Sequence, residues 1–286
     1  MRLKTILLLL AISILQANAM SDKSIEEYMG NYVKKKNKLE VKHIDIISTY
    51  PIDDAPGWSV HFLEMIVKVK MGDSYQDAVM KKTVFTKGNR LTVNLMKKGR
   101  IGKSGKRKKS RSYTKLLKPM VPVDAYDDKH FIAGSKDAPH KVLIFSDPFC
   151  PYCAKKFPEI LKVVRANPKI YGLYYYHFPL VQIHPASNIT TKVMHLFHEK
   201  GEVDKMVELY DLSINAKETD VDKILKSIKA KTGVKFTKEQ ISSPEVKEAL
   251  RLDMLMKRRL QVTGTPTVFL DGRWDRMRKE YKKYAK

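Results

Sequence analysis

Residues 141–158 read KVLIFSDPFCPYCAKKFP and contain both cysteines of the chain, Cys150 and Cys153. The first six residues form a short apolar run, which favours a buried strand. The residues that follow favour a helix up to Asn167, with Pro151 in its first turn, where a missing N–H costs nothing. The stretch therefore predicts a strand, a tight turn and a helix that begins at the cysteine pair.

The spacing of the two cysteines points to redox chemistry. Cysteines three residues apart at a helix start bring their sulfurs within bonding reach, and the helix dipole stabilises a thiolate on Cys150. Such a position lowers a thiol pKa from ~8.5 into a range of about 3.5–7.5. The Cys150 thiolate is expected to attack a disulfide, and Cys153, one turn further along, to resolve the mixed disulfide. Pro151 and Tyr152 form the dipeptide between them.

Other roles for these cysteines fit less well. A purely structural disulfide between Cys150 and Cys153 would close too small a loop to restrain much of the chain. A zinc half-site would need a second cysteine pair, and His195 and His198, three apart on a predicted helix, have no cysteine beside them in sequence. We therefore expect no metal and no cofactor other than a redox-active disulfide between Cys150 and Cys153.

The chain beyond the cysteines alternates strands and helices. Residues 170–178 are rich in strand-forming residues. Three helices are expected over 185–230 and one from Pro244 to about Leu260. A strand at 267–270, a turn at Asp271-Gly272 and a basic helix over 274–285 complete the pattern. This order predicts an α/β domain over residues 126–286 with helices inserted before its last strand.

A second motif identifies the family that this domain resembles. Thr263–Phe269 reads TGTPTVF, and together with the strand, CPYC and helix that precede it, it resembles the thioredoxin superfamily. In that family a cis proline faces the active-site cysteines, and Pro266 matches it, with Thr265 before it. The resemblance implies that Thr265 and Pro266 bind substrate. Pro158 matches the kink that the family often carries in this helix.

The first nineteen residues have the pattern of a secretory signal. Arg2 and Lys4 precede an apolar run from Ile6 to Leu15, and small residues lead to an expected cleavage after Ala19. The alternative is an uncleaved anchor, but the run is about half of the roughly 20 residues that a span needs. We expect an exported protein, in a compartment where disulfides form and persist.

Residues 20–97 predict a small α+β domain. An apolar stripe at helical spacing runs through residues 22–38. Four extended segments follow, at 41–50, 58–70, 78–86 and 91–96. The last two flank Lys87-Gly88-Asn89-Arg90, a hairpin-type turn.

Composition excludes several classes of protein. The 286 residues suit one large or two ordinary domains, and 43% hydrophobic residues can fill a core, so wholesale disorder is excluded. Two cysteines cannot staple a disulfide-rich scaffold or complete a four-thiolate zinc site. The net charge of +24 suggests either an anionic partner or simply a soluble basic protein.

Much of the charge lies in one segment. Lys97–Arg111 holds nine basic residues, three glycines and no acidic residue. This composition predicts a solvated linker over 98–125, with a short helix at 112–117. The alternative is contact with an anionic surface. No aromatic residue interleaves the run, so a nucleic-acid partner is not expected.

The two-domain order as a whole resembles the periplasmic thiol:disulfide interchange proteins of the DsbC/DsbG type. Those proteins carry a cystatin-like dimerisation domain, a linker helix and a thioredoxin domain, and CPYC is the DsbG-type motif. The resemblance implies a V-shaped homodimer, unfolded or misoxidised exported proteins as clients, and a membrane thiol redox partner. Dimeric DsbA-like oxidases share the plan and stay in contention.

Three functions follow from these patterns. The first is a periplasmic disulfide isomerase or reductase that acts through the CPYC dithiol. The second is a dimeric thiol oxidase; Tyr152, where strong oxidants carry a histidine, and Thr265 before the proline both favour the isomerase. The third belongs to another class, a chaperone-like binding protein whose basic face holds anionic clients or membrane.

Overall fold

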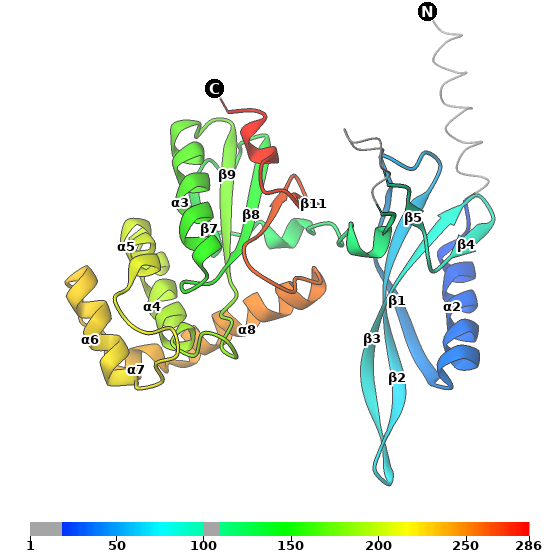
Figure 1. The fold of residues 1–286 in the computed structure, drawn as a ribbon, viewed down its shortest axis with the longest axis horizontal. Coiled ribbons are helices and arrows are strands. Elements are labelled where there is room, and N and C mark those ends of the chain that lie inside the picture. Colours follow the sequence, from blue (N-terminus) through cyan, green and yellow to red (C-terminus); the bar gives the residue numbers. More distant parts are fainter. Residues whose placement is uncertain (1–18, 100–108, 286) are drawn as a thin grey trace, which may run out of the picture. The chain divides into compact units, whose positions relative to one another are not determined.

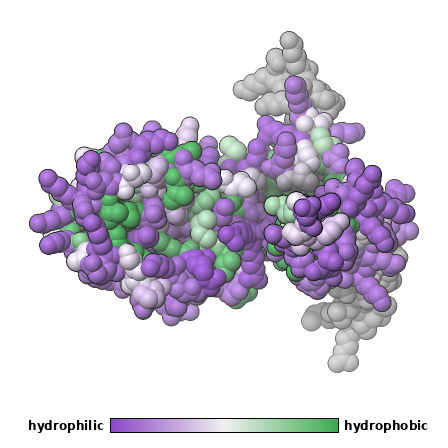
Figure 2. All heavy atoms as spheres, turned by 90° about the horizontal axis from the view of Figure 1, so that it is seen from below, coloured by the Kyte–Doolittle hydropathy of each residue, from purple (hydrophilic) through white to green (hydrophobic). Residues whose placement is uncertain are grey.

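The computed structural model describes residues 19–99 and 109–285, which form two compact units that divide after Pro119 (Figure 1). The predicted signal peptide lies almost wholly in residues 1–18, outside the described residues. In the described part of the chain, no helix has the length and apolar character that crossing a bilayer requires. Hydrophilic side chains dominate the face drawn in Figure 2, as the high content of lysine and arginine leads one to expect.

The first unit begins with α2 (Asp22–Asn37), whose start and buried face follow from its sequence. The Ser21 side chain caps the helix by accepting a hydrogen bond of 3.2 Å from the Ser24 amide. Ile25, Met29 and Val33 lie on the predicted apolar stripe and are fully buried. They pack against a four-stranded antiparallel sheet, which lies alongside α2 in Figure 1.

That sheet has the order β1-β2-β3-β4, with each strand paired to the next one in the chain. Its strands are β1 (Glu40–Pro51), β2 (Ser59–Met71), β3 (Ser74–Lys87) and β4 (Arg90–Thr92). The predicted turn joins β3 to β4, with Lys87 paired to Arg90. One helix and four strands are therefore confirmed, while the cystatin-like character and the dimerisation role of this unit stay predictions.

The segment predicted as a linker is partly built into the first unit. Residues 100–108, the centre of the basic run, lie outside the described residues. On either side of them, β5 (Met96–Lys97) pairs with β6 (Arg111–Ser112). The expected short helix is a single 3₁₀ turn, η1 (Tyr113–Lys115), and its Tyr113 is buried beside Phe85 and donates a hydrogen bond of 2.9 Å to Asp54. An aromatic anchor therefore ties residues 109–119 to the first unit.

The second unit is built on a five-stranded sheet of order β11-β10-β8-β9-β7. The central strands, β8 (His140–Ser146) and β9 (Tyr171–His177), run parallel, because α3 (Pro151–Ala166) crosses over between them. All other pairs are antiparallel. They involve the strands β7 (Phe131–Gly134), β10 (Thr267–Leu270) and β11 (Arg273–Trp274).

Helices between β9 and β10 form the predicted insertion. Besides the short 3₁₀ turn η3 (Leu209–Asp211), they are α4 (Ser187–Glu199), α5 (Val203–Glu208), α6 (Val221–Thr232), α7 (Lys238–Ile241) and α8 (Pro244–Arg259). A further 3₁₀ turn, η2 (Val123–Ala125), precedes β7. A thioredoxin-like fold with a mixed sheet and inserted helices is therefore confirmed. Two elements of only four residues each, β7 and α7, were not predicted from the sequence.

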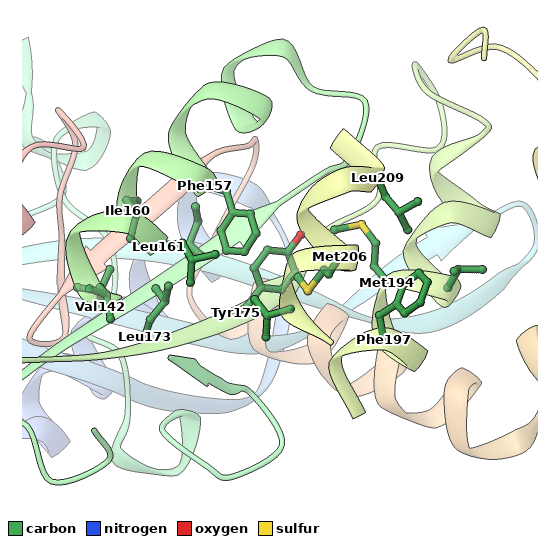
Figure 3. Close-up of a cluster of buried hydrophobic side chains, with 14 of the residues drawn as sticks. Val142, Phe157, Ile160, Leu161, Leu173, Tyr175, Met194, Phe197, Met206 and Leu209 are labelled. Carbon is green, nitrogen blue, oxygen red and sulfur yellow. The ribbon is translucent and has the colours of Figure 1, made fainter. Parts of the chain in front are cut away.

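Strand β9 is buried along its whole length, so the unit has a core on each face of the sheet. Tyr171, Leu173 and Tyr175 face a core formed with α3, α4 and α5 (Figure 3). Tyr174 and Tyr176 face a second core on the other side, with Leu260 and Val262. Neighbouring tyrosines of one strand therefore belong to opposite sides of the sheet.

The prediction of a basic helix over residues 274–285 was wrong. The chain forms the two-residue strand β11 and then one 3₁₀ turn, η4 (Glu280–Lys282). Arg278 has a φ of 54°, which breaks any continuous helix there. Tyr281 is fully buried and its hydroxyl donates a hydrogen bond of 2.9 Å to Glu159 of α3, so tertiary anchoring outweighs the helical preference of this lysine-rich tail.

Candidate active site

The cysteine pair lies at the N-terminus of α3. Cys150 is the N-cap residue with an extended backbone, Pro151 occupies the first helical turn, and both cysteines are free thiols. The Cys150 carbonyl accepts hydrogen bonds from the amides of Cys153 (2.9 Å) and Ala154 (3.1 Å), which close the first turn. Cys150 is 6% exposed and Cys153 is fully buried, while Tyr152 is 72% exposed. A reactant therefore reaches Cys150 before Cys153.

The environments of the two thiols shift their pKa values in opposite directions. A hydrogen bond from Cys153 is the largest cause that lowers the pKa of Cys150 to about 5, with further help from Thr265 and from the amides of Cys153 and Tyr152; burial opposes the shift. Burial, and then the hydrogen bond to Cys150, raise the pKa of Cys153 far above its usual range. At neutral pH the pair is a thiolate at Cys150 and a thiol at Cys153.

The Thr265-Pro266 segment lies against the cysteines across 115 residues of sequence. The peptide bond between the two residues is cis, as the resemblance implies. The Cys150 sulfur lies 3.5 Å from the Thr265 carbonyl oxygen, and the Thr265 hydroxyl lowers the pKa of both thiols. That hydroxyl is buried and has no hydrogen-bond partner of normal geometry in the described part of the chain. The structure therefore brings together Cys150, Cys153, Thr265 and Pro266.

Three hydroxyl groups of the second unit form a hydrogen-bonded row. Ser146, the last residue of β8, lies 2.6 Å from the hydroxyl of Tyr210 in η3. The Tyr210 hydroxyl also lies 2.6 Å from that of Tyr175 in β9. The Ser146 hydroxyl lowers the pKa of Cys153 through a hydrogen bond. Sequence reasoning missed this set, because no local pattern relates Tyr210 to residues more than 30 positions away.

Asp147 fixes the turn that leads into the cysteine motif. Its carboxylate is fully buried and accepts hydrogen bonds from the Phe149 amide (2.8 Å), the Leu180 amide (2.7 Å) and the Ser187 hydroxyl (2.8 Å). His184 Nδ1 lies 3.0 Å from the same carboxylate. One side chain thus ties the residues before Cys150 to the loop after β9. The sequence signal for it is its position three residues before Cys150.

We expect Asp147→Asn to destabilise the second unit by about 3 kcal/mol, because an amide nitrogen cannot accept from these donors and leaves buried groups unpaired. Urea unfolding followed by circular dichroism would measure the change. Asp211→Asn is the matched control, because Asp211 is exposed and, among the described residues, its carboxylate pairs only with the Lys231 side chain. Equal unfolding midpoints for the two variants would contradict the prediction.

A cavity of about 670 Å³ lies elsewhere in the second unit and is lined by four histidines. Burial lowers the pKa of His177 well below its usual value, and it also lowers those of His195 and His198. His177 is 2% exposed, and neither ring nitrogen has a hydrogen-bond partner among the described residues. Burial opposes the charge on His130, but the hydrogen bonds and attraction of Asp253 and Asp127 raise its pKa overall.

These histidines should make the protein sensitive to acid. A buried histidine stays neutral in the folded chain while the unfolded chain takes up a proton below a pH of about 6.5, so each such group costs up to about 1.4 kcal/mol of stability per pH unit. The raised pKa of His130 does not offset this loss, because its contribution is already complete below pH 6.5. We expect the free energy of unfolding to fall as the pH decreases from 7 to 5.5. In His177→Leu the slope of the unfolding free energy against pH should be smaller by the equivalent of about one proton. Urea unfolding at several pH values would measure this slope. Identical slopes in the variant and the wild type would refute the prediction.

No metal centre accompanies these groups in the described ranges. Across residues 19–99 and 109–285, no three histidine, cysteine, aspartate or glutamate side chains converge in a way that could hold a metal ion. His195 and His198 line the cavity from α4, where His195 lies 3.4 Å from Glu199.

Two curated proteins are similar to about half of this chain. Two curated relatives are 24% identical over 170 residues, the Na⁺/H⁺ antiporter NhaA 1 of Salinispora arenicola and the Na⁺/H⁺ antiporter NhaA 3 of Salinispora tropica. The alignment covers 55% of this chain and 24% of each relative, so the chain spans about a quarter of their length.

Similar solved structures also cover about half of the chain. A thioredoxin-like oxidoreductase from Silicibacter pomeroyi is 21% identical, with a TM-score of 0.43 over 54% of this chain and 87% of that one. Oxidised BdbD from Bacillus subtilis is 15% identical, with a TM-score of 0.45 over 58% and 92%. DsbA2 from Pseudomonas aeruginosa is 20% identical, with a TM-score of 0.37 over 50% and 81%.

The second unit also matches a protein family as a whole. Residues 127–286, more than half of the chain, match the family described as thioredoxin. They include the strand, the CPYC helix and the cis-proline segment described above. The chain therefore belongs to the thioredoxin family.

Proposed function

We propose that the protein is a thiol–disulfide oxidoreductase that acts on exported proteins as a disulfide isomerase or reductase. The single observation that carries the proposal is the asymmetry of the pair: Cys150 at the helix N-cap has a pKa of about 5, and Cys153 is a buried thiol. The Cys150 thiolate attacks a substrate disulfide, and Cys153 then displaces the substrate and leaves a Cys150–Cys153 disulfide. That disulfide is the only redox group that the mechanism uses.

We place substrate at the Thr265-Pro266 segment. Its carbonyl contacts Cys150, and the exposed Tyr152 borders the same sulfur along the helix start. A substrate strand that pairs with this backbone would bring its disulfide to Cys150. Clients would then be recognised mainly through their backbone, which suits unfolded or misoxidised proteins of varied sequence.

The low pKa of Cys150 sets the expected pH dependence of its alkylation. Because only the thiolate reacts, iodoacetamide labelling should increase through a midpoint near pH 5 and be level above about pH 6. Cys153 should stay unlabelled over this range, because burial keeps it protonated. Mass spectrometry of tryptic peptides would measure both rates; equal or faster labelling of Cys153 would reverse the roles that we assign.

A thiol oxidase is the second candidate, and the same pKa supports it. Stabilising the Cys150 thiolate favours the dithiol form, which makes the disulfide a stronger oxidant. Recovery of active ribonuclease from its scrambled form would support the isomerase. Rapid oxidation of reduced ribonuclease without recovery of the scrambled form would support the oxidase. A Cys150→Ser protein that kept its cellular role would instead favour a chaperone-like protein.

We also propose that the first unit forms a homodimer. The β2–β3 hairpin carries exposed apolar side chains, among them Met71, Tyr75 and Val79, each at least 59% exposed. Covering them with a second copy would remove apolar surface from water. Light scattering coupled to gel filtration tests this part, and a monomeric mass would reject it.

We also propose a periplasmic location and a membrane redox partner for the protein. The signal pattern of residues 1–19 supports export to the periplasm with cleavage after Ala19, and a membrane thiol redox partner would then restore the working redox state. The in vivo redox state of the pair separates the two candidates, since a mostly reduced pair indicates an isomerase or reductase. Contact of Lys97–Arg111 with an anionic surface stays a proposal, and we propose no nucleic-acid partner.

A further inference from the structure

The chain after β11 forms a strap held by β10 and α3 instead of the basic helix that its sequence predicts. This C-terminal strap, residues 275–283, lies in the red end of the ribbon in Figure 1. At its start the Asp275 amide donates a hydrogen bond of 2.9 Å to the Val268 carbonyl of β10. Near its other end the Tyr281 hydroxyl donates one of 2.9 Å to Glu159 of α3. The strap therefore joins the strand that follows the cis proline to the helix that begins at the cysteines.

Arg278 connects the C-terminal strap to the cis proline itself. Its Nη1 donates a hydrogen bond of 3.3 Å to the Pro266 carbonyl, and no other described residue donates to that oxygen. The backbone at Arg278 is left-handed, with a φ of 54°, a conformation that costs a non-glycine residue about 1 kcal/mol. The Arg278 amide closes this turn with a hydrogen bond of 3.0 Å to the Asp275 carbonyl. A tight turn of the strap thus places a guanidinium at the Thr265-Pro266 segment.

The charge of Arg278 lies close to the backbone at which we place substrate. The Thr265 carbonyl oxygen is 3.5 Å from the Cys150 sulfur, and Pro266 is the next residue. The Cα atoms on the two sides of a cis peptide bond are about 2.9 Å apart. With its hydrogen bond of 3.3 Å to Pro266, the guanidinium therefore lies within about one Debye length, roughly 8–10 Å, of the Thr265 backbone. Salt at physiological strength does not fully screen a charge at that distance.

The other charges of the C-terminal strap leave this region positive. The strap holds five basic residues and two acidic ones. The acidic side chains are engaged within the strap: Glu280 pairs with Lys283 at 2.5 Å, and the buried Asp275 accepts a hydrogen bond of 2.7 Å from the Glu280 amide. Arg276 and Lys279 are exposed and form no ion pair with any described residue. This part of the surface therefore attracts anions.

From these contacts we infer that Arg278 is a specificity-determining residue, which favours clients that carry an acidic side chain next to the disulfide that Cys150 attacks. The inference rests on the proposed function and names a class of substrate for it. The bond to Pro266 uses one N–H of the guanidinium and leaves others for a carboxylate. Because that bond already orders the side chain, a client loses less conformational entropy when it binds there.

Peptides that differ only in the residue before a cysteine test this preference. Three short peptides carry glutamate, glutamine or lysine there, and their single cysteine is activated as a 2-pyridyl disulfide. The Cys150 thiolate of the reduced full-length protein attacks the peptide sulfur, a Cys150–peptide disulfide forms, and 2-thiopyridone leaves with the electron pair of the broken bond. Its absorbance in stopped flow measures the rate. At low ionic strength we expect the glutamate peptide to react about fivefold faster than the glutamine peptide, and the lysine peptide about fivefold slower.

Two variants of Arg278 separate its charge from its hydrogen bond. Arg278→Gln keeps an N–H group that can donate to Pro266 and removes the charge. It should reduce the ratio of the glutamate rate to the lysine rate from about 25-fold to about fivefold, and change the glutamine rate less than twofold. Arg278→Lys keeps the charge and should keep the ratio. Arg165→Gln is the matched control, because it removes the same charge from the last turn of α3, at the opposite end of the helix from Cys150; its ratio should equal that of the wild type.

The possible outcomes distinguish this inference from the proposed function. Equal rates for the three peptides in the wild type, or an unchanged ratio in Arg278→Gln, would overturn the role of Arg278 and leave the proposed function intact. The same slowing of all three peptides in Arg278→Gln would also overturn it, since the side chain would then only support the Thr265-Pro266 segment. A wild-type protein that released no 2-thiopyridone from any peptide would overturn the proposed function, and the inference with it.

Discussion

Replacing Cys150 with serine should abolish thiol–disulfide exchange, with a loss of more than about a thousandfold, because a serine hydroxyl does not ionise near neutral pH and cannot form a disulfide. Replacing Cys153 with serine should leave attack by Cys150 intact and remove resolution. The Cys153→Ser protein should therefore accumulate a mixed disulfide with its substrate. The two variants differ from wild type by one sulfur atom each, and each serves as the control for the other.

Reduction of insulin and mass spectrometry under non-reducing conditions would measure both effects. The proposal requires that the trapped adduct be released by dithiothreitol and be absent from Cys150→Ser. The assignment of nucleophile and resolving residue would be wrong if Cys150→Ser kept exchange activity. It would also be wrong if Cys150→Ser, and not Cys153→Ser, accumulated the adduct.

Replacing Gly134 with alanine should destabilise the second unit by more than about 3 kcal/mol. Gly134 ends β7 with a φ of 85°, and an added Cβ would lie 1.9 Å from the backbone oxygen of Tyr171. That oxygen accepts the hydrogen bond from the Ser135 amide at 3.0 Å, and β7 pairs with β9 at this point. The clash is with backbone, so no side-chain rotation relieves it.

Gly201→Ala is the matched control for this prediction. Gly201 also has a positive φ, of 70°, but nothing lies within 4 Å of its added Cβ. It should therefore lose only the conformational preference of glycine, about 1 kcal/mol. Urea unfolding of both variants separates the contributions, and a loss at Gly134 no larger than that at Gly201 would show that the β7–β9 contact tolerates a side chain.

Local patterns were sufficient for most of the helices and strands. Ser21 and the stripe of Ile25, Met29 and Val33 determine α2 through interactions within one or two turns, and Pro151 does the same for the start of α3. Prediction failed where distant contacts decide the backbone. The tail after Trp274 is lysine-rich and reads as a helix, but the burial of Tyr281 against α3 leaves it a single turn.

The residues of the candidate site also differ in whether local sequence patterns could assign them. Cys150, Pro151, Tyr152 and Cys153 could be assigned from sequence because their spacing and their place at a helix start already define the chemistry. Thr265 and Pro266 could be assigned only through a family resemblance, since nothing local shows that they face the cysteines. Ser146, Asp147 and Tyr210 could not be assigned, because their roles depend on hydrogen bonds to residues between 33 and 64 positions away.

The sequence by itself determined that this chain carries one vicinal thiol pair at the N-terminus of a helix, in a thioredoxin-like order of strands and helices. Helix capping, the helix dipole and hydrophobic periodicity act over a few residues, so the sequence displays them directly. The tertiary structure decided which thiol is acidic and what surrounds the other. Burial and hydrogen bonding set the two pKa values, and both depend on groups that the fold gathers from the end of β8, the start of α3 and the cis-proline loop.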